Sequence, residues 1–307
     1  MSPATRPGLG IALMVGAAVS FATLDTMVKT VAAAVPVIAI LWVRYTFQAV
    51  TMGAWLAPRG AAPFRSRQPF FQIVRGVLLL ATSALAWSSL KWLPVAEFTA
   101  INMLAPVLVT LLAALVLRER VSRLRWVLVG LAFVGGLMIV RPGSGLYGAV
   151  VLLPLASALC YACFQVLTSR MASLEQPTTT HFYTGLVGAA ILTPMVVASG
   201  IDVPALAARI DATTLALLLA CGAAGTLGHL MLVFALGHAP AATLMPFLYT
   251  QIAAATLGGW LVFGQLPDGW AFLGMAVIAF AGAVSAWMNL RASRPAASPV
   301  AVDTVAE

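Results

Sequence analysis

Residues 212–236 read ATTLALLLACGAAGTLGHLMLVFAL and contain no Asp, Glu, Lys or Arg. A helix needs about 20 mostly apolar residues to cross a hydrocarbon layer about 30 Å thick, and this stretch is long enough. Backbone polar groups inside a bilayer must be paired within their own segment, which favours a helix. The stretch therefore predicts a transmembrane helix.

Similar apolar stretches fill most of the remaining chain. Turn-forming or charged residues separate them, and no gap is long enough for an extramembrane domain. The ten predicted spans are residues 9–28, 35–57, 69–90, 95–117, 124–141, 147–169, 179–199, 212–236, 241–263 and 269–290. The sequence thus predicts an all-α integral membrane protein, with residues 1–8 as an N-terminal segment and 291–307 as a disordered tail.

The composition excludes a water-soluble globule. Charged residues make up 8% of the 307 positions and apolar residues 62%, whereas soluble proteins average about 25% charged residues. The net charge of +8 is spread over short gaps between spans, so we expect the lipid bilayer and a small molecule as partners and no nucleic acid. The three cysteines lie in apolar runs and predict inert thiols, with no metal site and no cofactor.

Positive residues are distributed unevenly between the two sides of the predicted membrane domain. With a cytoplasmic N-terminus, the inside segments hold twelve: Arg6, Arg59, Arg65, Arg67, Arg75, Arg118, Arg120, Arg123, Arg125, Arg170, Arg291 and Arg294. The outside segments hold four: Lys29, Lys91, Arg141 and Arg209. The positive-inside rule therefore predicts a multi-pass protein of a bacterial-type inner membrane with both termini in the cytoplasm.

The two halves of the chain are weakly similar to each other. Pairing residues 94–119 with 240–265 gives six identities, and at a slightly different shift Trp126 pairs with Trp270. Five spans in each half is an odd number, so the second half must enter the membrane in the opposite direction. The pattern predicts an inverted repeat with one half at 9–141 and the other at 147–290, an architecture that supports alternating access.

Several short motifs resemble the EamA-type members of the drug/metabolite transporter superfamily. They are Leu93-Pro94-Val95-Ala96-Glu97, Ala105-Pro106-Val107-Leu108-Val109, Leu117-Arg118-Glu119-Arg120, Arg141-Pro142-Gly143, Pro240-Ala241-Ala242-Thr243 and Phe263-Gly264-Gln265. The resemblance covers about residues 9–290 and implies ten helices around a central cavity. Members of this family export amino acids or import vitamins or nucleoside-like metabolites, so the resemblance implies a transport function of this kind. Gln265 stands where the family often has Glu, which puts charge pairing there in doubt.

Ionisable side chains inside a membrane need a partner or a function. Asp25 and Lys29 are one turn apart and form either an ion pair at a helix end or a contact for substrate or protons. Arg44 lies in an apolar span with Gln48 one turn on. It forms either a structural pair with Asp25 or an anchor for a substrate carboxylate.

The other embedded polar residues complete the predicted site. Aromatic and amide residues could contact substrate or bridge helices, namely Tyr161, Gln165, Asn102, Tyr249 and Gln251. Lys29, Glu97 and His229 are the candidates for gating or coupling, although Glu97 could reach outward and His229 could be a core residue. We find no catalytic constellation in the sequence.

These features predict a secondary transporter of a small organic metabolite that is amino-acid-like or aromatic, with export slightly favoured. An uptake transporter for a vitamin or nucleoside-like metabolite, such as riboflavin or S-adenosylmethionine, is the first alternative. An intramembrane enzyme using Asp25, Glu97 and His229 is an alternative of another class. A homodimer also stays open.

Overall fold

The computed structural model describes residues 7–105, 107, 108, 112, 123–141, 148–171, 174–238, 244 and 247–292. The regular structure it describes is helical. The α-helices are α1 (Pro7–Val31), α2 (Val37–Leu56), α3 (Pro69–Ser89), α4 (Val95–Asn102), α6 (Arg123–Val140), α7 (Leu152–Met171), α8 (Pro177–Ala198), α9 (Val203–Arg209), α10 (Ala212–His238), α12 (Thr250–Phe263) and α13 (Gly269–Ala292). Three short 3-10 helices are Ala57–Arg59, Ala62–Phe64 and Gly148–Val151.

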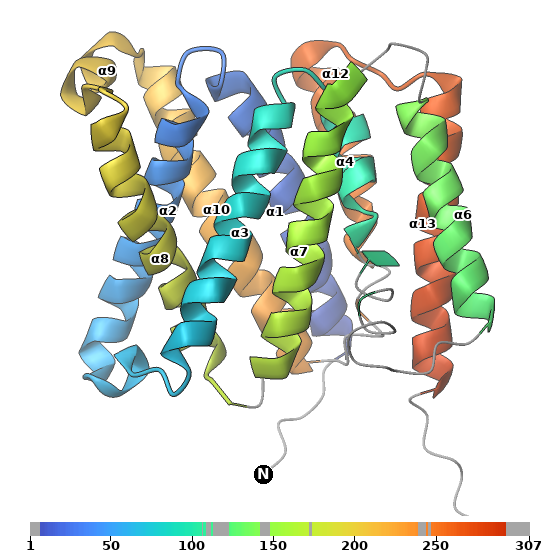
Figure 1. The fold of residues 1–307 in the computed structure, drawn as a ribbon, viewed down its shortest axis with the longest axis horizontal. Coiled ribbons are helices and arrows are strands. Elements are labelled where there is room, and N and C mark those ends of the chain that lie inside the picture. Colours follow the sequence, from blue (N-terminus) through green and yellow to red (C-terminus); the bar gives the residue numbers. More distant parts are fainter. Residues whose placement is uncertain are drawn as a thin grey trace, which may run out of the picture.

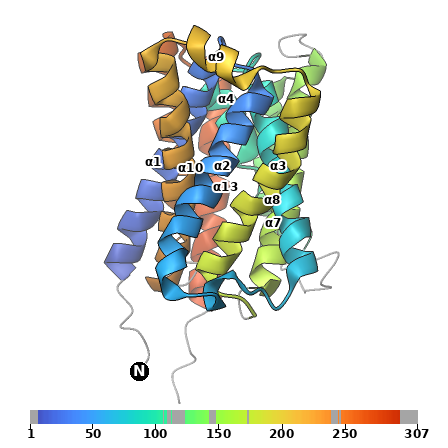
Figure 2. The same ribbon diagram turned by 90° about the vertical axis from the view of Figure 1, so that its left-hand side faces the viewer.

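Each predicted span contains one of these helices. Six are long and apolar enough to cross a membrane, namely α1, α2, α3, α7 with the 3-10 turn before it, α8 and α10. Shorter apolar helices cover residues 126–140, Thr250–Phe263 and Gly269–Val284. The all-helical membrane fold is therefore confirmed. The seven-residue helix α9 was not predicted, and it lies across one end of the bundle (Figure 2).

The two halves run in opposite directions. In Figure 1, α1 begins at the end of the bundle where α13 finishes, whereas α7 begins at the opposite end. We call the first the termini end and the second the distal end.

Helix packing follows the same inversion. The helices of the two halves correspond in chain order: α1, α2, α3, α4 and α6 to α7, α8, α10, α12 and α13. When each helix is replaced by its counterpart, every contact named below becomes an observed contact. The contact of α1 with α10 becomes that of α7 with α3, and the contact of α2 with α10 becomes that of α8 with α3. The pairs α2–α8, α4–α12 and α6–α13 map onto themselves. The predicted inverted repeat is present in the tertiary structure.

Glycines bring α6 and α13 into direct contact. A Cβ atom added to Gly135 would lie 2.8 Å from the Gly274 carbonyl oxygen, and one added to Gly274 would lie 2.5 Å from the Gly135 carbonyl oxygen. Small residues allow helix backbones to approach in this way inside a membrane. Gly130, on the same helix as Gly135, has open space beside it.

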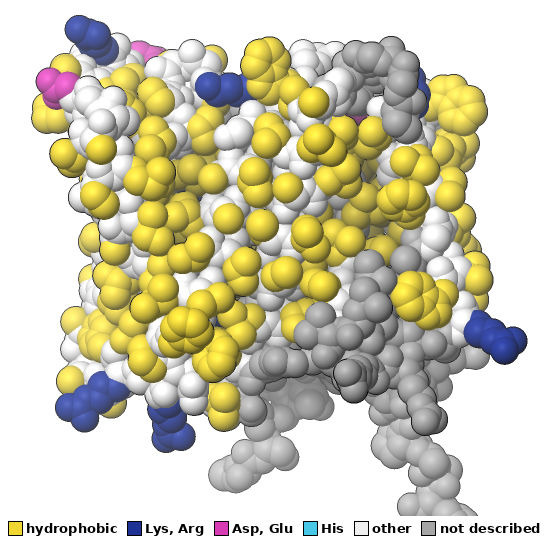
Figure 3. Space-filling view, in the orientation of Figure 1, with side chains coloured by type: hydrophobic (Ala, Val, Ile, Leu, Met, Phe, Trp, Pro, Cys, Tyr) yellow, Lys and Arg dark blue, Asp and Glu magenta, His cyan; other side chains and the backbone are white. Residues whose placement is uncertain are grey.

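The outer side of the bundle suits lipid. On the face shown in Figure 3, apolar side chains are spread over the middle of the described part, and Lys, Arg, Asp and Glu lie near its two ends. Large apolar side chains such as Phe70 and Val197 are well exposed there. Because water is excluded from a bilayer core, such a surface is stable only in lipid.

Candidate functional site

Arg44 lies buried inside α2, with 3% of its surface exposed. Its guanidinium carbon lies 4.6 Å from the centroid of the Tyr45 ring and 5.4 Å from that of the Trp87 ring. Nη1 donates to Ser83 Oγ over 3.4 Å, whereas Nε has no partner among the described residues. Gly225 of α10 makes room for it, since a Cβ there would lie 2.7 Å from Arg44 Nε. Aromatic faces therefore hold this cation in place without neutralising it.

Asp25 is buried on α1, with 9% of its surface exposed. Its carboxylate is within interaction range of Trp87, Arg44 and Gln251. No ion pair joins Asp25 to Arg44 in the part of the chain that the structure describes. A direct structural pair between them is therefore not formed, although both charges lie in the same region of the bundle.

Of the two alternatives for Asp25 and Lys29, the ion pair is not formed among the described residues. Lys29 Nζ instead donates to the Leu93 carbonyl oxygen over 2.7 Å and to Gln265 Oε1 over 3.2 Å. It also lies 5.2 Å from the centroid of the Phe263 ring. Although the two residues are one turn apart on α1, the long lysine side chain extends to the distal end of the bundle, where carbonyl and amide oxygens are available.

A second polar contact lies at the distal end. Arg141, after α6, pairs with Asp268, before α13. The backbone N–H of Ala271 and the Arg141 guanidinium hold the pKa of Asp268 below its usual range. Glu97, buried near the start of α4, lies within electrostatic range of Lys29 as well as of this pair. Glu97 therefore belongs to the distal end and does not lie beside Arg44.

Arg75 was counted as a loop charge in the sequence, but α3 buries it, with 7% of its surface exposed. Its Nε donates to Thr168 Oγ1 of α7 over 2.7 Å. Its Nη1 donates to the Thr180 carbonyl oxygen and Thr184 Oγ1 of α8, over 3.0 and 2.8 Å. The centroid of the Phe164 ring lies 4.6 Å from the guanidinium carbon of Arg75. Arg75 thus ties one helix of the first half to two helices of the second.

Two histidines lie next to each other between α8 and α10. The ring centroids of His181 and His229 are 5.9 Å apart, and the Phe21 ring packs edge-on against His229 at 4.9 Å. Gln48, one turn after Arg44, contacts His181 from α2. The inverted repeat therefore brings together polar residues from α2, α8 and α10, with Phe21 of α1 packed against them.

The remaining predicted residues are distributed less tightly. Gln165 Nε2 donates to the Tyr161 hydroxyl over 3.3 Å, so this predicted neighbourhood on α7 is present. Tyr249 packs in a separate apolar cluster, against Gly282 of α13. Asn102 ends α4 and keeps part of its surface exposed. The structure therefore groups Asp25, Arg44, Gln48 and their neighbours but leaves Tyr249 apart from them.

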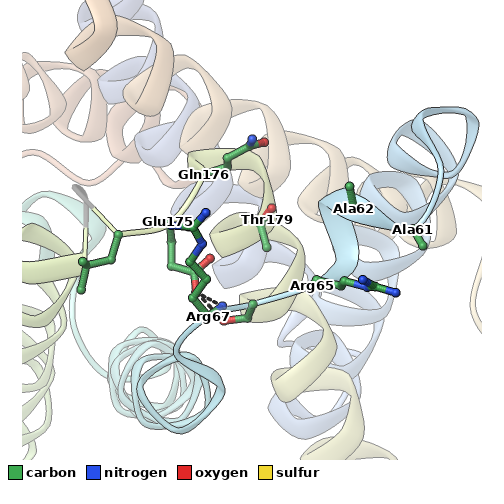
Figure 4. Close-up of a pocket in the computed structure, with 9 residues that line it drawn as sticks. Ala61, Ala62, Arg65, Arg67, Glu175, Gln176 and Thr179 are labelled. Carbon is green, nitrogen blue, oxygen red and sulfur yellow. Dashed lines mark hydrogen bonds between the residues drawn. The ribbon is translucent and has the colours of Figure 1, made fainter.

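A surface hollow of about 840 Å³ lies at the termini end, away from these residues. It is lined by Ala61, Ala62, Arg65, Ser66, Arg67, Leu174, Glu175, Gln176 and Thr179 (Figure 4). Glu175 Oε1 accepts hydrogen bonds there from Ser66 Oγ, Arg67 N and Gln68 N, over 2.6, 2.6 and 2.9 Å. These contacts join the loop before α8 to the start of α3, so the hollow is a junction between loops.

His181, Arg75 and Trp87 were absent from the predicted site. Arg75 falls six residues inside the predicted span 69–90, and the rule that an intramembrane arginine needs partners was enough to single it out. His181 and Trp87 lie near span ends, where a histidine or tryptophan is ordinarily at the membrane surface. No sequence signal marked His181, because its position depends on helix packing.

Comparison with known proteins agrees with this architecture. A family model described as the EamA-like transporter family matches residues 8–141 and, again, residues 148–287. One solved structure superposes with a TM-score of 0.65 at 19% sequence identity, covering 93% of this chain and 99% of the other. At this identity the likeness shows a shared fold.

Three curated relatives carry the names of their substrates. The chain is 30% identical over 277 residues to a riboflavin transporter of Rhizobium johnstonii, with 89% of each chain covered. It is 22% identical over 245 residues to an S-adenosylmethionine uptake transporter of Rickettsia prowazekii, with 80% of this chain and 81% of the relative covered. It is 27% identical over 273 residues to a pseudopaline exporter of Pseudomonas aeruginosa, with coverages of 89% and 94%. Because the family model matches both inverted halves, the chain belongs to the EamA-like transporter family.

Proposed function

We propose that this protein takes up a flat, polar heteroaromatic metabolite across a bacterial inner membrane, with riboflavin as the first candidate. The 30% identity to the riboflavin transporter of R. johnstonii over 277 residues supports the substrate class. The S-adenosylmethionine uptake transporter of R. prowazekii supports inward transport. The slight preference for export drawn from the sequence is therefore replaced by uptake.

The burial of Arg44 and Asp25 close to each other, with no ion pair between them among the described residues, is the observation that carries this proposal. A guanidinium group and a carboxyl group thus lie in one region without a direct ion pair. Such a site favours a substrate of zero net charge that offers both hydrogen-bond donors and acceptors. Because a guanidinium plane stacks on aromatic rings, Arg44 is also suited to a flat ring system.

Transport by the purified protein in sealed vesicles tests the substrate class directly. We expect saturable entry of radiolabelled riboflavin into proteoliposomes, recovered chemically unchanged, and its loss in Arg44→Ala. Arg209→Ala, which alters an exposed arginine on α9, is the matched control and should transport normally. Equal flux in protein-free vesicles and proteoliposomes would refute riboflavin as a substrate.

An amino-acid-like substrate is the second candidate, because the free Nε of Arg44 suits a carboxylate. The pseudopaline exporter of P. aeruginosa supports export in this case. A panel of unlabelled amino acids, S-adenosylmethionine and riboflavin as competitors separates the candidates. Growth of a riboflavin-requiring strain at limiting riboflavin, with and without the protein, then decides the direction.

A further inference from the structure

The side-chain amide of Gln48 has a single possible orientation. Its Nε2 lies 2.9 Å from the backbone carbonyl oxygen of His181. A carbonyl oxygen only accepts hydrogen bonds, so the NH₂ group must face it, since the amide oxygen would be repelled. The orientation of this amide thus follows from a group whose hydrogen-bonding role is fixed.

This orientation also sets the tautomer of the His181 ring. The same Nε2 of Gln48 lies 3.2 Å from His181 Nδ1. An amide NH₂ has two protons, one for the carbonyl and one for the ring, and it has no acceptor capacity. Nδ1 must therefore be the unprotonated acceptor, which places the ring proton on Nε2.

The arrangement leaves one donor and one acceptor without a protein partner. His181 Nε2 and Gln48 Oε1 are both buried and make no hydrogen bond within the described part of the chain. The two side chains are 4% and 0% exposed. A buried polar group left unpaired costs about 1–3 kcal/mol, so a pair of them in one contact calls for an explanation.

Neighbouring residues show that the fold is able to satisfy buried polar groups at this level of α8. Thr180 and Thr184, on either side of His181, both accept from Arg75, and Thr184 Oγ1 also donates to the Thr180 carbonyl oxygen. Arg44 Nε, one turn before Gln48 on α2, is again unpaired among described residues. Arg44 Nε, Gln48 Oε1 and His181 Nε2 are thus unpaired among the described residues, and so is Gln72 Oε1, whose Nε2 donates to Thr180 Oγ1.

We propose that His181 and Gln48 together recognise the substrate by hydrogen bonds, with His181 binding one acceptor of the substrate and Gln48 binding one donor. His181 Nε2–H donates to a carbonyl oxygen of the substrate, and Gln48 Oε1 accepts from a substrate N–H. An amide or imide edge, such as the dione edge of a flavin ring, offers both groups. The pair rests on the proposed function for its substrate, whereas the His181 tautomer rests on the protein alone.

The tautomer is tested without any substrate. The ¹⁵N spectrum of histidine-labelled protein in nanodiscs distinguishes a protonated from an unprotonated ring nitrogen, and His181→Gln assigns the signal. We expect a neutral His181 ring with its proton on Nε2, and a loss of this preference in Gln48→Met. A proton on Nδ1, or a ring that exchanges freely between tautomers, would overturn the proposal.

Transport of a blocked analogue tests the recognition of the substrate. In the wild type, methylation of the imide nitrogen of riboflavin removes the donor that Gln48 accepts, and should weaken competition with riboflavin by about tenfold. Gln48→Met should not distinguish the methylated from the unmodified flavin. His181→Gln, which keeps an N–H donor near the place of Nε2, should retain most transport, and His181→Phe should raise KM strongly.

The outcomes separate this inference from the proposed function. If the wild type carries riboflavin but Gln48→Met still rejects the methylated analogue, the recognition by His181 and Gln48 is wrong and the flavin substrate stands. If the wild type does not carry riboflavin, the substrate assignment fails. In that case the expected tautomer still supports His181 as a fixed donor, and the opposite tautomer refutes it.

Discussion

The ammonium group of Lys29 donates a hydrogen bond of 2.7 Å to the backbone carbonyl oxygen of Leu93. This contact joins α1 to the turn between α3 and α4 at the distal end, and Gln265 adds a second acceptor from the other half of the chain. A transporter that opens alternately to its two sides must break such contacts on one side. We therefore expect Lys29 to help hold the distal end closed.

Replacing Gln265 by Glu should strengthen this closure. The substitution turns a neutral hydrogen bond into an ion pair with Lys29, which is worth up to about 1 kcal/mol at a partly exposed site. We expect a higher melting temperature and slower transport than in the wild type, with both effects shrinking at high salt. Lys29→Met removes the ammonium donor and should weaken the closure. A single cysteine introduced in place of Thr26 should then be labelled faster than in the protein that keeps Lys29. A lower melting temperature for Gln265→Glu would contradict this role.

Glu175→Gln should destabilise the termini end. Its carboxylate accepts from the backbone N–H groups of Arg67 and Gln68, directly before α3, and hydrogen bonds to charged groups contribute about 1.5–3 kcal/mol. We expect a lower melting temperature in detergent. Arg65→Gln, at an exposed residue of the same hollow, should leave stability nearly unchanged. Equal losses in the two variants would assign the effect to charge alone.

A double-mutant cycle separates the two roles of Arg44. Arg44→Lys keeps the charge but loses the planar fork that stacks on Tyr45 and holds a carboxyl or carbonyl group. If Arg44 binds substrate, Arg44→Lys should reduce transport strongly, and Arg44→Ala combined with Asp25→Ala should not restore it. If the pair only balances charge, the double variant should recover both protein level and flux relative to either single variant. Full recovery of flux would exclude a substrate contact.

Arg75→Lys should lower stability without changing substrate preference. Lysine cannot reproduce hydrogen bonds to Thr168 on α7 and to Thr184 on α8 at the same time. Hydrogen bonds to charged groups contribute about 1.5–3 kcal/mol each, so protein level and melting temperature should fall clearly. The ranking of competing substrates in transport should stay as in the wild type. A changed ranking would place Arg75 in contact with the substrate.

The orientation of the protein in the membrane stays a prediction from charge. Without Arg75, which α3 buries, the asymmetry is eleven positive residues against four. In a cysteine-free background, single cysteines at Ser2 and Ser293 should react with an impermeant reagent only from the cytoplasm, and one at Gly145 only from the other side. These three positions lie outside the described residues. The reverse pattern would show that the topology is inverted.

The sequence by itself determined that this protein lies in a lipid bilayer, where its helices are, and that its two halves are related by an inversion. Apolar runs such as residues 212–236 must form helices in lipid because no water satisfies their backbone groups. An odd number of spans per half then fixes the inversion. Arg44 and Asp25 could also be singled out, because a charge in such a run is costly wherever the helix packs.

The tertiary structure alone decided which polar residues meet. Lys29 and Asp25 share a face of α1, yet the lysine extends to Leu93 and the carboxylate stays deep, which spacing along one helix does not reveal. His181 and Gln48 are 133 residues apart in the sequence. They meet because the crossing of α2 and α8 sets the distance between them. Such partners depend on how helices of opposite halves pack, and periodicity within one helix carries no information about that packing.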